Sequence, residues 1–152
     1  MRRALLLVPL LLLAAPAGRL GAQVASGDSV KWGPAPPFFP AGAKFAVLQG
    51  NPSAAGEYTV RLSMPAGYVI APHWHPTDEH VTVISGTMLL GMGDHVDRLK
   101  AARLRAGGFI TAPAKAHHFA VAAGASVVQV HGMGPFEITY VRPADDPRTP
   151  KR

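Results

Sequence analysis

The chain has 152 residues and a formal net charge of +6, and its length predicts a single domain. It has no cysteine, which excludes disulfides and thiol chemistry. Charged and aromatic residues are sparse, whereas 16 glycines and 15 prolines punctuate the chain. This composition is typical of short strands joined by many turns and argues against a helix-rich fold.

Residues 1–22 have the pattern of a secretory signal peptide. Arg2 and Arg3 precede an apolar run at residues 4–15, which one proline interrupts, and small residues follow. The run is shorter than the roughly 20 apolar residues of a membrane span, so an uncleaved anchor is the weaker alternative. We expect cleavage after Ala22 and export to the periplasm or the extracellular space, with no membrane association of the mature chain.

Removal of this segment takes away three arginines and lowers the formal charge from +6 to +3 (12 basic minus 9 acidic residues). Basic residues remain close together in one stretch, Arg98, Lys100, Arg103 and Arg105. A basic cluster can mark a nucleic-acid surface. No stacking aromatic or binding motif accompanies this one, and export argues against nucleic acid. We therefore interpret it as a solvated strand edge, with an anionic substrate or surface as the weaker alternative.

An arm at residues 23–44 carries four prolines and three aromatic residues, which predicts extended chain. We expect it to pack along the domain or against a neighbouring subunit, with a loose tail as the alternative. The domain is predicted to span residues 45–141 and to be followed by a solvated tail at residues 142–152. Outside the motif described next, the expected strands are 45–48, 58–64, 88–92, 98–104, 109–111, 126–130 and 136–141.

Three potential metal ligands, His73, His75 and Glu79, lie within seven residues. The two histidines are two positions apart, so on a strand both imidazoles point to the same face. A Pro-Thr-Asp turn at residues 76–78 follows them. Glu79 then begins a second strand, from which its carboxylate can fold back toward the same point. Two imidazoles and a carboxylate on a hairpin are ligands suited to a divalent transition metal.

The spacing of this stretch resembles the first motif of the cupin superfamily. Every defining position of that motif is present: Gly67, His73, His75, Glu79 and Gly86. The second cupin motif is matched at Gly107, Pro113 and His118, but Lys115 stands where the motif has glycine and Ala122 where it has asparagine. The lysine at position 115 is unexpected for the local turn, because the motif usually has a glycine with positive φ at this position.

The resemblance covers residues 45–141 and implies an all-β, single-domain fold, a double-stranded β-barrel of the jelly-roll type. It implies a metal inside the barrel, bound by His73, His75, Glu79 and His118, and a homodimer. The alternatives are ordinary histidines in proline-flanked loops and a barrel that has lost its metal. Matches in two separate windows disfavour the first, and the second is disfavoured because no ligand position is substituted.

His117 and His118 are adjacent in a predicted strand, so only one of them can face the interior. Apolar alternation slightly favours burial of the face with His117, Phe119 and Val121. The motif spacing selects His118. We follow the motif spacing, because both faces of a cupin sheet can be covered in a dimer.

Alternation also places Val81 and Val83 on the face of Glu79 and His80 on the opposite face, away from the metal. The metal is therefore expected beside an apolar wall. Candidates for that wall are Met64, Trp74, Met88, Met92 and Phe109, with ordinary core packing as the alternative for each. Near strand ends, His131 and Tyr140 are candidate pocket residues, and His95 is expected to be exposed.

Three imidazoles and one carboxylate leave one or two positions of an octahedral metal open, which is typical of a catalytic site. These ligands suit Fe, Mn, Ni, Zn or Cu and do not choose among them. The sequence thus predicts a metal-dependent oxidoreductase, dioxygenase-like, acting on a small organic substrate. The alternatives are a non-catalytic binding or sensing module and a metal-dependent isomerase or lyase. No catalytic residue beyond the ligands is identified, so the sequence leaves open whether the protein is an enzyme.

Overall fold

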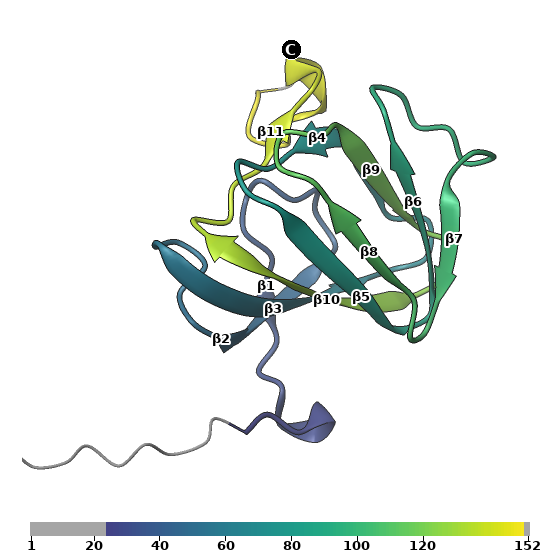
Figure 1. Ribbon diagram of the computed structural model, residues 1–152. Coiled ribbons are helices and arrows are strands. Elements are labelled where there is room, and N and C mark those ends of the chain that lie inside the picture. Colours follow the sequence, from purple (N-terminus) through teal and green to yellow (C-terminus); the bar gives the residue numbers. More distant parts are fainter. Residues whose placement is uncertain (1–23, 151–152) are drawn as a thin grey trace, which may run out of the picture.

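The computed structural model describes residues 24–150, nearly half of which form β-strands (Figure 1). The expected signal peptide at residues 1–22 lies outside the described residues. The strands are β1 (Gly33–Pro34), β2 (Lys44–Gln49), β3 (Gly56–Met64), β4 (Val69–Trp74), β5 (Glu79–Ser85), β6 (Thr87–Met92), β7 (Ala102–Arg105), β8 (Phe109–Ala112), β9 (His118–Ala122), β10 (Ser126–Gly134) and β11 (Thr139–Tyr140). Two short 3₁₀ helices, η1 (Gly27–Ser29) and η2 (Pro143–Asp145), lie near the ends.

The strands form two antiparallel sheets that lie against each other (Figure 1). The six-stranded sheet has the order β1–β2–β3–β10–β5–β8, and the five-stranded sheet has the order β11–β4–β9–β6–β7. Strands far apart in the chain are neighbours, since β10 pairs with both β3 and β5. This arrangement confirms the predicted all-β jelly-roll. Within residues 24–150, however, the two sheets do not close into a continuous barrel.

The main core lies between the sheets and is built by strand alternation. Along β3 every second side chain is buried, from Tyr58 through Val60 and Leu62 to Met64, as the pattern predicted. Met88 on the five-stranded sheet belongs to the same core. Full burial of one such side chain contributes about 1.5–3 kcal/mol. This packing holds together β4, β5 and β9, the strands that carry the predicted metal ligands.

A second apolar cluster explains why every residue of β9 is buried. Phe119 and Val121 pack with Leu89, and Val69 and Ala101 lie against them. The outer face of β9 is thus covered by the chain's own residues. Covering this face does not require the dimer on which the sequence argument relied.

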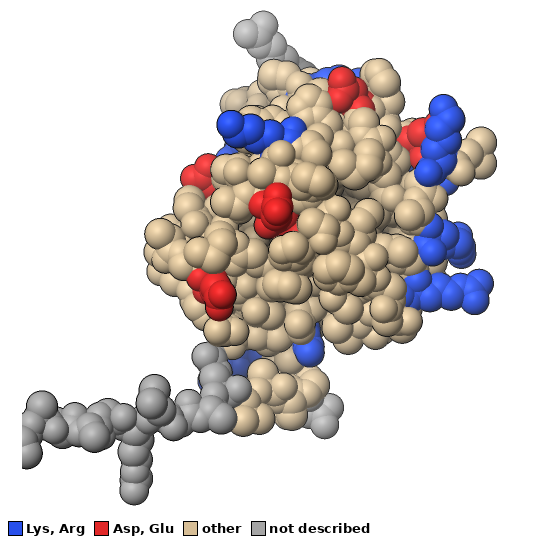
Figure 2. Space-filling view, in the orientation of Figure 1, with Lys and Arg blue, Asp and Glu red and all other residues tan. Residues whose placement is uncertain are grey.

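The basic stretch lies at a sheet edge, but its strand is shorter than predicted. The strand was expected at residues 98–104, whereas β7 begins at Ala102. Asp97 Oδ1 accepts hydrogen bonds from the backbone N–H groups of Leu99 and Lys100, which folds these residues into a turn. Figure 2 shows lysine and arginine side chains along the edge of the molecule where β7 lies in Figure 1.

The last two predicted strands differ in extent from β10 and β11, because glycines in this stretch allow close packing of the backbone. The glycines after residue 131 were taken to join strands 126–130 and 136–141, yet β10 continues to Gly134. A Cβ at Gly132 would lie 2.8 Å from the Asp78 carbonyl oxygen, and one at Gly134 would lie 2.2 Å from that of Ala54. These glycines therefore permit close backbone approach rather than a turn. The strand after them is shorter than expected, with β11 limited to Thr139–Tyr140.

The N-terminal arm lies against the domain. β1 pairs with β2, and the Phe39 side chain is buried. The Tyr140 hydroxyl donates a hydrogen bond to the Phe38 carbonyl at 2.7 Å, and the Tyr68 hydroxyl donates one to Pro40. The arm therefore closes one side of the core.

The segment after β11 is tied back by ion pairs, although most of its residues are exposed. Arg142 pairs with Asp145 at 2.8 Å and Arg148 pairs with Asp146 at 2.7 Å. Arg148 Nη2 also donates a hydrogen bond to the Ile138 carbonyl. No helix within residues 24–150 has the length and apolar character needed to cross a membrane.

Two glycines of the first motif should differ in how well they tolerate a side chain. Both have positive φ, +81° at Gly67 and +80° at Gly86. A Cβ at Gly67 meets open space, whereas one at Gly86 would lie 2.3 Å from the Ala125 carbonyl oxygen. We expect Gly67→Ala to lower the free energy of unfolding by about 1 kcal/mol and Gly86→Ala by about 3 kcal/mol or more. Urea unfolding of both variants checks this, and equal losses would contradict it.

Candidate metal centre

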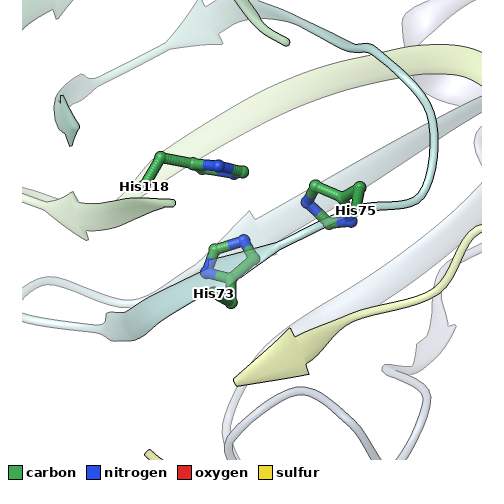
Figure 3. A group of neighbouring side chains, drawn as sticks. All are labelled: His73, His75 and His118. Atoms are coloured by element: carbon green, nitrogen blue, oxygen red, sulfur yellow. The ribbon is translucent and has the colours of Figure 1, made fainter. Parts of the chain in front are cut away.

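Three histidines converge between the sheets (Figure 3). His73 lies on β4, His75 follows directly after that strand, and His118 begins β9 as the cross-strand partner of His73. The ring centroids are 5.0 Å apart for His73 and His75, 4.3 Å for His73 and His118, and 5.2 Å for His75 and His118. Each side chain is buried, and one ring nitrogen of each lies within 4.8 Å of the others. These three residues could hold a metal ion.

Backbone carbonyls fix the protonation of all three rings. Each Nδ1 lies at hydrogen-bond distance from a carbonyl oxygen: His73 with Ala71 at 2.7 Å, His75 with Glu137 at 2.6 Å and His118 with Ala116 at 3.0 Å. Because a carbonyl oxygen only accepts hydrogen bonds, each Nδ1 must carry the proton. In the neutral ring, Nε2 then has a free lone pair, the form that binds a metal.

Glu79 brings its carboxylate to two of the three histidines. It begins β5 and is buried. Its Oε1 lies 3.5 Å from His75 Nε2, and its Oε2 lies 3.4 Å from His118 Nε2. Both Nε2 atoms are buried and lack a hydrogen-bond partner within the described residues. A carboxylate facing lone pairs at this distance is repulsive unless a cation or a proton lies between them, so the four residues together fit a metal ion.

The electrostatics of the site support this fit. Burial raises the pKa of the Glu79 carboxyl, but His75 and His118 together outweigh burial and hold it well below its usual range. Burial lowers the pKa of His75, but the charge and close contact of the Glu79 carboxylate and the hydrogen bond to Glu137 outweigh it, and the net pKa is raised. The Glu79 carboxylate therefore favours a proton on His75 in the metal-free protein. A bound cation would replace that proton.

His73 behaves differently because burial and its histidine neighbours outweigh the charge of Glu79. Burial, followed by the charges of His118 and His75, lowers its pKa to about 3. His73 therefore stays neutral at physiological pH. Its free Nε2 is available to a metal without loss of a proton.

A small apolar cavity adjoins the site. Its volume is about 30 Å³, and His73, Glu79 and His118 form its polar end. Apolar wall residues include Phe39, Val81 and Phe136. A cavity of this size holds about two water molecules. The apolar wall that the sequence predicted is present, but it encloses less space than an organic substrate needs.

The candidate wall residues divide into two groups. Met64 and Met88 line the cavity, as the sequence suggested. Met92 and Phe109 are exposed on the outside, so the prediction that they belong to the wall is wrong. Trp74 is half-buried but does not line the cavity. Phe109 points outward because it shares a cross-strand row with Thr82, on the face opposite Val81.

The structure settles which of the adjacent histidines faces inward. His118 is 3% exposed and belongs to the cluster. The His117 side chain is 39% exposed, and its Nδ1 donates a hydrogen bond to Asp94 Oδ1 at 2.5 Å. Burial therefore follows the motif spacing rather than apolar alternation. That His118 binds a metal remains a prediction.

The other histidines and Tyr140 lie outside the cluster. His80 points away from Glu79, as alternation predicted, and stacks with His131 on the outer face of the sheet. His95 is exposed, also as predicted. Tyr140 is buried with its ring centroid 6.0 Å from that of His73, and its hydroxyl holds the arm.

Two turns near the site are fastened to each other, a feature that the sequence analysis missed. Asp78 Oδ1 accepts a hydrogen bond from the Ala114 N–H at 2.7 Å. The Lys115 N–H donates one to the His75 carbonyl oxygen at 2.8 Å. These bonds hold the turn after His75 against the turn before His118. Asp78 was identified only as a turn former, and its distant partner leaves no local signal.

Lys115 adopts the backbone conformation that the motif reserves for glycine. Its φ is 61°, the one positive value at a non-glycine position within residues 24–150. The turn is therefore retained despite the substitution, at a cost in free energy. We expect Lys115→Gly to raise the free energy of unfolding by about 0.5–1 kcal/mol, since relief of strain exceeds the added entropy of the unfolded chain. Lys115→Ala, which keeps the Cβ, is the control for urea unfolding; an equal gain in both variants would show that the lysine side chain, not strain, is responsible.

Comparisons with known proteins agree with this fold. A sequence model of the ChrR cupin-like domain matches residues 21–137, which include both motifs. No curated protein matches the chain.

Three solved structures illustrate the likeness. A candidate acetylacetone dioxygenase from Methylibium petroleiphilum PM1 is 23% identical over 91% of each chain, with a TM-score of 0.64. An acetylacetone dioxygenase from Acinetobacter johnsonii is 16% identical over 88% of this chain and 87% of its own, with a TM-score of 0.63. A polyketide cyclase from Streptomyces resistomycificus is 17% identical over 84% of this chain and 90% of its own, with a TM-score of 0.68. At these identities the likeness shows a shared fold.

The family match covers most of the chain, and the structural neighbours have the same two-sheet architecture. The chain therefore belongs to the ChrR cupin-like family of the cupin superfamily.

Proposed function

We propose that the protein is an exported, metal-dependent oxidoreductase of the dioxygenase type that acts on a small organic substrate. The observation that carries the proposal is the site itself. Three buried histidines bring their ring nitrogens to one point, with the Glu79 carboxylate beside them and an apolar cavity adjoining. A metal held by His73, His75, Glu79 and His118 would supply Lewis-acid and redox chemistry at its open positions.

Each group around the site has a role in the proposed function. The carbonyls bonded to Nδ1 orient the three imidazoles, and Glu79 provides the negative charge that a divalent cation requires. Phe39 and Phe136 provide apolar surface to the cavity wall. The volume of about 30 Å³ accepts O₂ or one small group of a substrate. A complete organic substrate requires displacement of side chains in the wall.

The comparisons support the substrate class. Two of the structural neighbours are described by their names as acetylacetone dioxygenases, one of them as a candidate. Acetylacetone is therefore the first compound to test, followed by other small diketones and organic acids. Export rests on the sequence pattern of residues 1–22, and a homodimer rests on the family resemblance. N-terminal sequencing of the exported chain and light scattering test these two proposals.

Oxygen consumption provides the functional test. The chain is loaded anaerobically with Fe(II), Mn(II), Ni(II), Zn(II) or Cu(II) in turn and mixed with each substrate in an oxygen electrode. We expect one metal to support substrate-dependent uptake, which His73→Ala abolishes and His117→Ala retains. Glu79→Gln should remain folded, with weaker metal binding and lower activity. Turnover without oxygen uptake would contradict the dioxygenase proposal and favour an isomerase or lyase.

The small size of the cavity favours a second candidate, a binding or sensing module without turnover. In that case the metal-loaded protein would bind a small ligand tightly while no substrate is consumed. Titration calorimetry with the same compounds, followed by product analysis, separates the two functions. Binding without any product would support the sensing module.

A further inference from the structure

A second group of metal-ligating side chains lies on the outer face of the six-stranded sheet. One cross-strand row runs over four neighbouring strands: Thr59 on β3, His131 on β10, His80 on β5 and Thr111 on β8. His80 follows Glu79 in sequence, so the two side chains point to opposite faces of β5. The row is therefore separated from the interior histidines by the sheet itself.

The two histidines of this row are held close together. His80 and His131 are directly opposite each other on paired strands, and their ring centroids are 4.9 Å apart with an interplanar angle of 27°. The Phe109 ring also stacks on His80, with centroids 6.1 Å apart and an angle of 11°. His80 Nδ1 lies 3.0 Å from Thr111 Oγ1. His80 is thus fixed on two sides, and its Nε2 remains for another partner.

The His131 side chain is free to rotate so that it and His80 can bind the same metal ion. It is exposed, and its side chain makes no hydrogen bond within residues 24–150. A rotation of this ring can bring its Nε2 toward that of His80. Strand pairing keeps the two backbones at a fixed separation, so this change costs little beyond one side-chain rotamer.

Two carboxylate side chains line the same cleft as these histidines. His80 and His131 line a cleft of about 540 Å³ on the outer face of the sheet. Glu57 and Asp78 also line it, and both residues are exposed. Asp78 uses Oδ1 to accept the Ala114 N–H. Imidazole and carboxylate groups in one cleft are the ligand types that Zn(II), Ni(II) and Cu(II) prefer.

We propose that His80 and His131, assisted by a carboxylate of Glu57 or Asp78, form a second, surface site for a divalent transition metal. The site is open to solvent, unlike the buried centre, so it exchanges its ion readily and binds more weakly. The proposal does not depend on the proposed oxidoreductase function or on occupation of the interior centre.

Equilibrium dialysis of the full chain against Zn(II) and Ni(II) tests the proposal. The wild-type chain should bind an ion in the surface site in addition to any bound by the interior residues. His131→Ala should weaken that surface binding about tenfold or more and leave interior binding unchanged. His95→Ala, which removes an exposed histidine outside the cleft, should bind as the wild type does. Identical binding curves for His131→Ala and the wild type would overturn the proposal.

A spectroscopic measurement locates the ion independently. In the His73→Ala chain, whose interior centre should no longer hold an ion, substoichiometric Cu(II) should broaden the imidazole proton signals of His80 and His131 before that of His95. Thr111→Val should lower the affinity of this site, since it removes the contact that orients His80. Equal broadening of all exposed histidines would show non-specific binding and would contradict a built site.

Discussion

Replacement of His118 by alanine should remove nearly all metal binding, whereas replacement of His117 should change it little. His118 is buried with its Nε2 turned to the cluster, and His117 is bonded to Asp94 at the surface. Mutation of a residue that only hydrogen-bonds to a metal ligand typically lowers metal affinity about 10–100-fold. Loss of a ligand itself should lower the affinity by at least as much. Dialysis against Zn(II) and Fe(II), with metal counted per folded chain, measures both variants.

The pair of variants is a matched control, because the two histidines are adjacent in sequence and differ in the face they occupy. Circular dichroism shows whether each variant keeps its sheets. Retention of metal by His118→Ala together with its loss in His117→Ala would mean that the register of β9 is wrong. Equal retention in both variants would remove His118 from the proposed ligand set.

The metal-free protein should lose stability in acid, between about pH 6.5 and pH 3. His73 has a pKa of about 3 in the folded protein, against 6.5 for an unperturbed histidine, because of burial and then the charges of His118 and His75. Between these values the unfolded chain binds a proton that the folded chain does not. The free energy of unfolding therefore falls by about 1.4 kcal/mol per pH unit, on the order of 4 kcal/mol in total.

The neighbouring groups do not cancel this effect. The pKa of Glu79 is depressed by His75 and His118 despite burial, so its stabilisation is present above its ordinary value of 4.5 and is lost below it. The pKa of His75 is raised, since the charge and close contact of Glu79 and the hydrogen bond to Glu137 outweigh burial. Its stabilisation is complete below pH 6.5 and is lost as pH rises through the folded pKa. Stability of the metal-free protein should thus be highest near pH 6.5.

Urea unfolding at a series of pH values, with chelator present, measures this dependence. His73→Asn is the matched variant, because its side-chain amide can donate to the Ala71 carbonyl but does not titrate. Its stability should fall less steeply between pH 6.5 and 4.5 than that of the wild type. The same slope in both proteins would show that His73 is not the group responsible.

The sequence predicted the positions of the site residues because motif spacing encodes backbone geometry. The two-residue spacing of His73 and His75 places both rings on one face, and the turn before Glu79 returns its carboxylate to them. Apolar alternation did not predict that His118 is the buried histidine, and the reason is physical. Phe119 and Val121 are buried by a second cluster on the outer face, so apolar residues on both faces of β9 obscured the pattern.

Other features left no readable signal in the sequence. The carbonyls that orient the imidazoles belong to Ala71, Ala116 and Glu137, and any residue type provides a carbonyl. The extent of β10 was missed because glycine serves close approach as well as turns, and only the packed structure distinguishes these uses. The small size of the cavity depends on how Phe39 of the arm packs against the core, which no local pattern reports.

The central claim is that four residues on three strands and one turn hold a metal ion, and elemental analysis tests it most directly. The chain is purified without chelator or added metal, desalted and measured beside His73→Ala. We predict about one iron, manganese, nickel, zinc or copper ion per wild-type chain and a large loss in the variant. Absence of metal from both proteins, even after anaerobic reconstitution with each ion, would contradict the claim and leave the histidines as lining of a binding pocket.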